Sequence, residues 1–187
     1  MISDMRIFKI ILKTSIFLYL LYFGWQIWAT QDFFQFSEVD YIKNANIIFH
    51  EAGHTLFIFF GDFLHTLGGS LLQIAIPFLL ALYFLLLRKE VFSTGVMLFW
   101  TAGSITDVGF YVADAQKTFI PLLGFPGGGA AGHDWHYLLG VMGVLDKTDM
   151  IAGVVFLFAG IFFVCAFLLL LYSLYLDFLK LDLNKKL

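Results

Sequence analysis

Five long apolar segments are the feature that most restricts what this chain can fold into. A helix that crosses a bilayer needs about 20 mostly apolar residues. Five stretches have that character: residues 7–29, 41–60, 67–87, 91–113 and 151–176. Sixty per cent of the 187 residues are hydrophobic and only 13 per cent are charged, about half the charged share of a soluble domain. We therefore predict an all-α polytopic membrane protein with about five transmembrane helices.

The same composition excludes several classes of protein. The chain has too little charge to cover a water-soluble surface, and its net charge of −3 provides no basic field to attract nucleic acid. Its single cysteine, Cys165, excludes a disulfide framework or a four-thiolate zinc site within one chain. The sequence contains no evident repeat and no soluble segment. We expect one integral membrane domain, residues 1–187, with membrane lipid around it.

Basic residues near the two ends of the chain bear on its orientation. They are Arg6, Lys9, Lys13, Lys180, Lys185 and Lys186. Because cytoplasmic segments carry an excess of Lys and Arg, the first cluster predicts a cytoplasmic N-terminus in a bacterial cytoplasmic membrane. The second cluster predicts a cytoplasmic C-terminus as well. Five crossings would place the two termini on opposite sides of the membrane. Either residues 137–150 therefore form a short or re-entrant sixth passage, or one of the two basic clusters does not indicate the cytoplasmic side.

The first apolar segment is interpreted as a retained span and not as a cleaved signal peptide. Its apolar stretch is long, and no small-residue cleavage site follows it. Between the later spans, residues 114–136 form a glycine-rich loop with two prolines, a glycine run at 127–129, and His133 and His136. Non-helical backbone at membrane depth is tolerated only where protein or a water cavity satisfies it. This loop therefore predicts a site.

The second apolar segment contains His50-Glu51-Ala52-Gly53-His54, an HExxH motif. Positions i and i+4 of a helix are about 40° apart around the axis and one turn apart along it, so both imidazoles can reach one metal ion. Glu51 can then act as a general base on water without binding the metal. A charged side chain at membrane depth costs at least about 2.5–3.5 kcal/mol, which favours a metal site over three solvated side chains at the membrane edge.

A catalytic zinc site normally has a third protein ligand, and a second cluster supplies candidates. This cluster is Gly132-His133-Asp134-Trp135-His136. The residues that follow it read as the start of a helix, where the macrodipole favours an acidic side chain. On the residues alone, the third ligand stays open among Asp134, His136 and His133. The alternative is an interfacial loop whose side chains face lipid headgroups.

Together these motifs resemble those of the site-2 protease family of intramembrane zinc metalloproteases. The resemblance implies that His50 and His54 bind zinc, that Glu51 is the general base, and that Asp134 from a later segment is the third ligand. The chain departs from the family because His136 stands where a small residue is usual and no glycine follows Asp134. The matching segments cover less than half of the chain. A group of small bacterial membrane proteins with the same motif set is a further resemblance.

The third apolar segment contributes one more match to the family. Residues 68–73, Gly-Gly-Ser-Leu-Leu-Gln, resemble a glycine-led segment in which asparagine is common at the position of Gln73. This amide is predicted either to donate to a developing oxyanion or to make an interhelical hydrogen bond. Gly68 and Gly69 are expected to allow close packing of helices. Pro77 is expected to kink the span.

The fourth apolar segment carries an acid within its length. Asp107 shares a helical face with Tyr111 and Asp114 at spacings of four and seven residues. An acid at membrane depth suggests function, and Asp107 is predicted to bind metal, to accept the N–H of a ligating histidine, or to relay protons. Asp114 is predicted to cap the span or join the site. His65, after a turn at residues 61–62, is expected at the surface.

These patterns favour a zinc-dependent hydrolase with its site inside the bilayer. We expect one Zn²⁺ per chain and, as substrate, a transmembrane protein or peptide. One alternative is a non-proteolytic membrane metalloenzyme, such as a lipid hydrolase or an iron-dependent oxidase, although membrane di-iron enzymes generally use more than the five histidines present here. Another is a metal-binding transporter or sensor, which would need several weak sites along a path.

Overall fold

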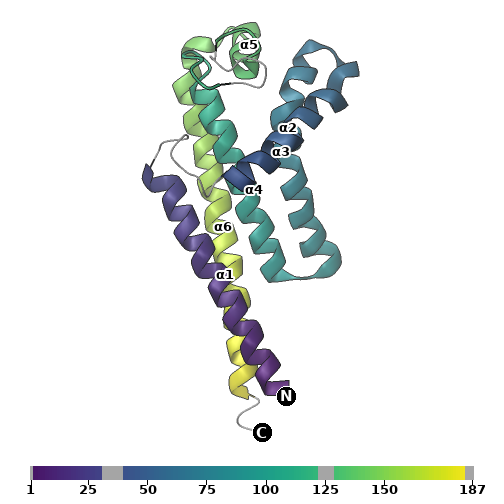
Figure 1. Ribbon diagram of the computed structural model, residues 1–187, viewed down its shortest axis with the longest axis vertical. Helices are drawn as coiled ribbons and strands as arrows, with labels where there is room; N and C mark the ends of the chain where they lie inside the picture. Colours follow the sequence, from purple (N-terminus) through teal and green to yellow (C-terminus); the bar gives the residue numbers. More distant parts are fainter. Residues whose placement is uncertain (1, 31–39, 122–128, 184–187) are drawn as a thin grey trace. The chain divides into compact units, whose positions relative to one another are not determined.

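The computed structural model describes residues 2–30, 40–121 and 129–183, which form helices and turns and contain no strand (Figure 1). The helices are α1 (Ile2–Thr30), α2 (Asp40–Phe57), α3 (Asp62–Leu82), α4 (Val91–Ala113), α5 (Asp134–Val141) and α6 (Thr148–Leu183). Short helical turns follow α2 (η1, Ile58–Phe60), follow α3 (η2, Tyr83–Arg88) and precede α6 (η3, Leu145–Lys147).

Four of these helical segments are long and apolar enough to cross a membrane in the part of the chain that the structure describes. They are Met5–Ile27, Asp62–Arg88, Val91–Ala113 and Leu145–Asp182. The chain is thus an all-α polytopic membrane protein, as its composition predicts. The span at 91–113 has the predicted bounds. The third span begins earlier than predicted, at Asp62, and the last is longer at both ends. The third span also continues through Pro77 as helix.

The predicted span at residues 41–60 forms a helix but is not among those four. Helix α2 and the turn η1 cover it, and three charged residues, Asp40, Lys43 and Glu51, fall within the 18 residues of α2. The segment at 137–150 is not among those four either. Helix α5 has eight residues and is therefore about 12 Å long, well short of the ~30 Å hydrocarbon core.

The chain packs as two compact units that interleave along the sequence. Unit 1 comprises residues 1–32, 77–100 and 161–187, and unit 2 comprises residues 33–76 and 101–160. Three of the boundaries fall inside the long helices α3, α4 and α6. All the candidate ligands predicted from the sequence belong to unit 2.

Aromatic side chains hold unit 1 together. In this unit, α1 lies beside the second half of α6 (Figure 1). Phe99 of α4 is central, with ring centroids 6.0 Å from Phe23, 5.1 Å from Phe163 and 5.8 Å from Phe167. Gly24 lies against two of these rings, since a Cβ there would be 3.3 Å from each of Phe99 and Phe167. Small residues and edge-to-face rings thus bring the helices of unit 1 together.

The core of unit 2 fixes the short helix α5 against α4 and α6. Five buried apolar residues form it: Val108, Val112, Ala115, Leu139 and Ala152. Leu139 of α5 is fully buried among them. The indole of Trp135 adds a polar link, because its Nε1 donates to Ser70 Oγ of α3 at 3.1 Å. The first turn of α5 is therefore held against α3 and α4 from both sides.

Helices α2 and α3 cross in close contact through glycines. A Cβ on Gly53 would lie 2.2 Å from the carbonyl oxygen of Gly68, and a Cβ on Gly68 would lie 2.8 Å from the carbonyl oxygen of Gly53. Real side chains do not reach such distances, so only glycine fits at either position. The prediction of close packing at Gly68 is confirmed. Gly53 lies within the HExxH motif, so this crossing places the motif against α3.

Candidate metal centre

Three side chains from two distant parts of the sequence meet in unit 2. Nε2 of His50 lies 2.9 Å from Oδ2 of Asp134, and Nε2 of His54 lies 3.2 Å from the same oxygen. The two imidazoles come from successive turns of α2, and the carboxylate comes from the first residue of α5. Each of the three side chains is 13–17 per cent exposed. The group is therefore largely withdrawn from solvent yet still accessible.

The opposite nitrogen of each imidazole is held by a protein oxygen. Nδ1 of His50 donates to Oε1 of Gln73 at 3.1 Å, and Nδ1 of His54 donates to the carbonyl oxygen of His65 at 2.9 Å. Since an oxygen that can only accept faces each Nδ1, Nδ1 carries a proton in both rings, and Nε2 is the nitrogen that can either donate to Asp134 or bind a metal ion. Such hydrogen bonds fix the tautomer and the ring orientation of metal-binding histidines.

His65 and His54 pair reciprocally across the crossing of α2 and α3. Nδ1 of His65 donates to the carbonyl oxygen of His54 at 2.8 Å, and the two rings lie 5.3 Å apart. The expectation of a surface position for His65 is wrong, because its side chain is half-buried against α2. This pair secures both the backbone of the motif and the orientation of its second imidazole.

Asp134 is positioned by the start of α5. Its backbone N–H donates to the hydroxyl of Tyr111 at 3.0 Å, and an acid in a first helical turn is stabilised by the macrodipole. Burial raises the pKa of the Asp134 carboxyl, but the hydrogen bonds with His50 and His54 lower it by more, so its pKa lies below the ordinary value. Asp134 is thus an ionised side chain in a partly buried place.

His133 builds the loop and caps the helix. Its Nδ1 accepts from the backbone N–H of His136 at 3.2 Å, which makes it the N-cap of α5. Its Nε2 therefore carries the proton and donates to Asp114 at 3.3 Å. Burial lowers the pKa of His133 and the charge of Asp114 only partly offsets this, which is consistent with a neutral ring. Both ring nitrogens are engaged, so the structure gives His133 a positioning role.

The carboxylate of Asp114 accepts hydrogen bonds from the backbone at the start of the glycine-rich loop. Its two carboxylate oxygens accept the backbone N–H groups of Phe119 at 3.0 Å and of Ile120 at 2.8 Å, besides the contact with His133. The run at 127–129 that suggested the site falls outside the described residues except for Gly129. The described part of the loop therefore supports α5 through hydrogen bonds to Asp114.

Two further sequence candidates lie elsewhere in unit 2. His136 donates from Nδ1 to the carbonyl oxygen of Ala115 at 2.8 Å. Asp107 accepts from Nδ2 of the buried Asn46, whose Oδ1 in turn accepts from Ser104. Within the described residues, the group able to hold a metal consists of His50, His54 and Asp134 and does not include His136 or Asp107. Asp107 instead joins α4 to α2 one turn before His50.

Gly69 keeps the space in front of the imidazoles open. A Cβ at this position would lie 2.7 Å from Nε2 of His50 and 2.7 Å from Nε2 of His54. Any larger residue would therefore push against the two nitrogen atoms that converge on Asp134. The prediction that Gly69 allows close packing is confirmed, and the contact shows which atoms require it.

The donor set and its spacing fit a zinc ion. Zinc bonds to histidine nitrogen and carboxylate oxygen are about 2.0–2.2 Å long, so ligand atoms around a tetrahedral ion are about 3.3 Å apart. The two nitrogen–oxygen distances of 2.9 and 3.2 Å are close to that value, and the ligand atoms all lie within 4.8 Å of one another. These three side chains would leave a fourth position open on such an ion, as in catalytic zinc sites.

Glu51 stands beside this group on the exposed side of α2. Its side chain is exposed, whereas Asn46, five residues earlier, is buried against α4. It is absent from the group that could hold a metal, as the HExxH pattern requires of a general base. The carboxylate can therefore be reached by a molecule that approaches from outside.

Sequence reasoning assigned no role at the centre to three residues that shape it. Asn46, Tyr111 and His65 each make a contact that orients a ligand or its helix. Asn46 lies four residues before His50 and Tyr111 four after Asp107, so the helical period was a usable signal for a shared face. No pattern in the sequence indicates the reciprocal pairing of His65.

Comparisons with protein-family models, with curated proteins and with solved structures found no match to this chain. The resemblance of its two motifs to the site-2 protease family therefore stays a prediction.

Proposed function

We propose that this protein is a zinc-dependent membrane hydrolase that cleaves a peptide bond in a membrane-associated protein or peptide. One observation carries the proposal. Nε2 of His50 and Nε2 of His54 converge on one carboxylate oxygen of Asp134, at 2.9 and 3.2 Å, and the Nδ1 atom of each ring is hydrogen-bonded to a protein oxygen. His50, His54 and Asp134 would hold the metal. A Zn²⁺ ion bound by such a set supplies Lewis-acid chemistry and lowers the pKa of a water molecule to about 7.

The residues of the chain then have distinct tasks. Glu51 accepts a proton from the attacking water as its oxygen bonds to the amide carbon, and it delivers that proton to the leaving nitrogen as the C–N bond breaks. Gln73 and the carbonyl of His65 hold the two imidazoles in the required tautomer. We assign Gln73 this positioning task because its oxygen is engaged with His50. Gly69 keeps the reacting volume free of side chains.

A membrane substrate suits the surroundings of the site. The chain has four apolar helices that can span a bilayer, and the described residues form no separate soluble domain that could select a substrate. The backbone of a membrane segment is hydrogen-bonded within its helix, so a bond must leave the helix before water can attack it. The proposed substrates are therefore membrane segments of low helical propensity.

The test compares the wild-type protein with Glu51→Gln, both purified full length in detergent. Metal per chain is counted by mass spectrometry, and cleavage of a library of synthetic membrane-segment peptides is followed by the appearance of new termini. We expect one zinc per chain in both proteins. Cleavage by Glu51→Gln should fall about 10²–10⁴-fold, the usual contribution of a general base.

Glu90→Gln is the matched control, because it also replaces an exposed carboxylate by an amide but lies in the turn between η2 and α4. It should cleave like the wild type. Equal cleavage by Glu51→Gln with its zinc retained would refute the role of Glu51. Two irons per chain would favour the oxidase alternative, and release of fatty acid from lipid without peptide cleavage would favour a lipid hydrolase.

A further inference from the structure

The metal centre contacts α3 in the half of its span that follows the start. With η2, this helix forms the span Asp62–Arg88, which has 27 residues and is therefore about 40 Å long. The carbonyl oxygen of His65 holds His54 three residues after the start, and Gly69 faces both Nε2 atoms seven residues after it. The deepest contact, which Gln73 makes with the other imidazole, lies about 16 Å along the helix. Along α3, the centre is therefore nearer to the first residue of the span than to the last.

The contacts with α4 lie at the end of that helix. The hydroxyl of Tyr111 accepts the backbone N–H of Asp134, and Tyr111 is two residues before the end of the span Val91–Ala113. The loop that carries Asp134 leaves α4 at this end and leads to the last span, which begins at Leu145. Helix α5 packs against Ala152, near the start of that span. The centre is thus close to one end of each of three spans.

The order of the chain places these three ends on one face of the membrane. The second span starts at Asp62 and carries the chain to the opposite face, and the third span returns it to the first face at Ala113. Helix α5, the helix that the structure describes in the following loop, has eight residues and at about 12 Å is too short to cross. The last span therefore begins on this same face, at Leu145, whichever face the N-terminus occupies. We call it the site face.

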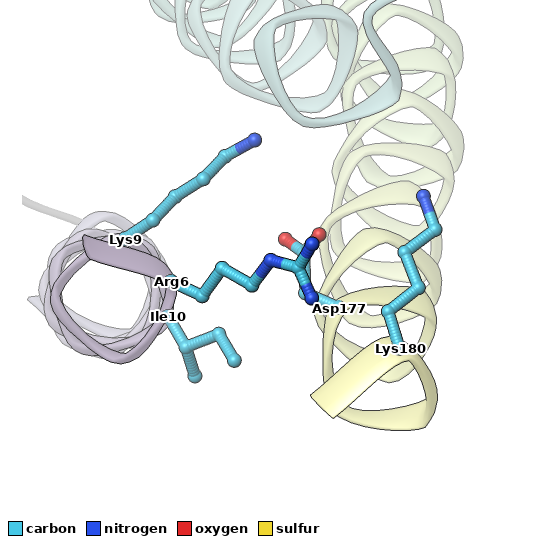
Figure 2. A pocket seen from close by; sticks show the side chains of 5 residues that line it. All are labelled: Arg6, Lys9, Ile10, Asp177 and Lys180. Atoms are coloured by element: carbon cyan, nitrogen blue, oxygen red, sulfur yellow. The ribbon is translucent and has the colours of Figure 1, made fainter. Parts of the chain in front are cut away.

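Basic residues gather at the opposite face. Arg88 and Lys89 lie in the turn between the second and third spans, and Lys180 lies near the end of the last span. Figure 2 shows that Lys180 lines one cavity of about 250 Å³ together with Arg6, which brings the start of α1 to the same end of unit 1. The loop on the site face between the third and last spans contains one basic residue, Lys117. Since cytoplasmic segments carry an excess of Lys and Arg, the site face is the non-cytoplasmic face.

We propose that the metal centre opens to the non-cytoplasmic face of the membrane, and that its substrate is the part of a membrane protein where a transmembrane helix ends at that face. The side chains of the centre are 13–17 per cent exposed, so a molecule on this face can reach them. The backbone groups at a helix end have no partner within the helix, so peptide bonds there are more accessible to water than those in its middle. The choice of substrate rests on the proposed hydrolase activity, whereas the face to which the centre opens does not.

The first test labels single cysteines from one face of sealed membrane vesicles prepared from a bacterial host. Cys165, the one native cysteine, is replaced by serine, and Asp62→Cys, Asp146→Cys and Glu90→Cys are then introduced separately. Each replaces an exposed acidic side chain; the first two lie at the site face and the third lies in the turn between η2 and α4. We expect a membrane-impermeant maleimide to label the first two in right-side-out vesicles and Glu90→Cys in inside-out vesicles.

Labelling in detergent gives the full reaction of each cysteine and serves as the control. Asp62→Cys or Asp146→Cys labelled only in inside-out vesicles, or Glu90→Cys labelled from the same face as these two, would overturn the assignment of faces. Asp62→Cys and Asp146→Cys that react in detergent but from neither face of the vesicles would show that these span ends do not reach a membrane surface, which also contradicts the proposal.

The second test removes the metal from one face. EDTA, which does not cross membranes, is added outside right-side-out and inside-out vesicles that contain the wild-type protein, and zinc per chain is counted after purification. We expect loss of zinc from the right-side-out vesicles and retention in the inside-out ones. Equal loss, loss from the inside-out vesicles alone, or retention in both would show that the centre does not open to the site face. A protein that never holds zinc would refute the proposed activity, and the cysteine labelling would still decide the face on which the span ends lie.

The third test concerns the substrate. Synthetic membrane-segment peptides with a Gly-Ser pair at an end of the apolar stretch are compared with peptides that carry the pair in the middle, and new termini are counted. We expect cleavage of the first set. Equal cleavage of both sets, or cleavage of the second set alone, would overturn the choice of substrate. If no membrane-segment peptide is cleaved, the hydrolase activity itself fails, and the face of the centre is decided by the first two tests.

Discussion

At the scale of single residues, the candidate centre depends on the protein oxygens that accept a hydrogen bond from Nδ1 of each imidazole. A histidine in an apolar helix can rotate and can exchange its tautomer, and neither change is compatible with a fixed metal ligand. Gln73 holds His50 and the carbonyl of His65 holds His54. Because one of these oxygens belongs to a side chain, its contribution can be measured by substitution.

Replacing Gln73 by leucine should weaken metal binding without removing a ligand. The change removes the acceptor for Nδ1 of His50, and loss of such a partner typically costs 10–100-fold in metal affinity. Zinc affinity is measured by competition with a chromogenic chelator. Gln73→Glu, which keeps an oxygen acceptor, should restore most of the affinity. If leucine and glutamate variants bind zinc equally, Gln73 does not position His50.

The sequence indicated which candidate ligands could meet better than it indicated the residues that hold them. The spacing of His50 and His54 follows from the helical period alone, whereas Asp134 was only implied by the resemblance, and the residues left His133 and His136 open beside it. Asp107 was expected near the site, but it accepts a hydrogen bond from Asn46. Periodicity indicates which residues share a face of one helix, but it does not determine which face of the next helix they meet.

At the scale of elements, the crossing of α2 and α3 determines where the HExxH motif lies. The backbones approach so closely at Gly53 and Gly68 that no side chain fits between them. Small residues at such crossings are the usual means by which membrane helices pack. The crossing also explains why α2 remains attached to unit 2, although it is not among the four helices that qualify as spans.

Gly53→Ala should therefore destabilise the protein strongly. The added Cβ would lie 2.2 Å from the backbone oxygen of Gly68, which cannot move away as a flexible side chain could. Overpacked positions cost about 1–3 kcal/mol and occasionally more, and we expect the upper end of that range. The free energy of unfolding is measured by denaturant titration in detergent.

Gly103→Ala is the matched control for this change. It lies inside α4, and no atom of the described residues lies within 4 Å of a Cβ built there. Alanine also favours helix over glycine by about 1 kcal/mol, so its stability should be unchanged or slightly higher. A Gly53→Ala protein as stable as the Gly103→Ala protein would mean that the two helices do not cross as described.

The sequence also determined most of the elements. Apolar length alone gave the span at residues 91–113 with its observed bounds, because a turn rich in charge precedes it and a polar loop follows it. Apolar length also predicted a span at residues 41–60, where the HExxH motif lowers the apolar character of the helix. The two compact units were not predictable, since their boundaries fall inside continuous helices.

At the scale of the whole molecule, charge is distributed unevenly between the two units. Eight of the eleven basic residues belong to unit 1: Arg6, Lys9, Lys13, Arg88, Lys89, Lys180, Lys185 and Lys186. They occur near the start of α1, in the turn before α4 and toward the end of the chain. This distribution bears directly on how the chain crosses the membrane.

Four crossings remove the conflict between the two basic ends of the chain. An even number of spans places both termini on one side of the membrane, and it places the Arg88–Lys89 turn on that side too, since two spans precede it. All three basic segments then lie together, as the excess of Lys and Arg in cytoplasmic segments requires. Five crossings would leave the termini on opposite sides.

We therefore predict that residues 1 and 187 both face the cytoplasm when the chain is expressed in a bacterium. Green fluorescent protein, which is fluorescent when it folds in the cytoplasm, should be fluorescent at either terminus. Alkaline phosphatase, which is active only after export, should be inactive at both. A fluorescent N-terminal fusion together with an active C-terminal phosphatase would show an odd number of crossings. In that case α2, with its three charged residues, would have to cross the membrane as a fifth span.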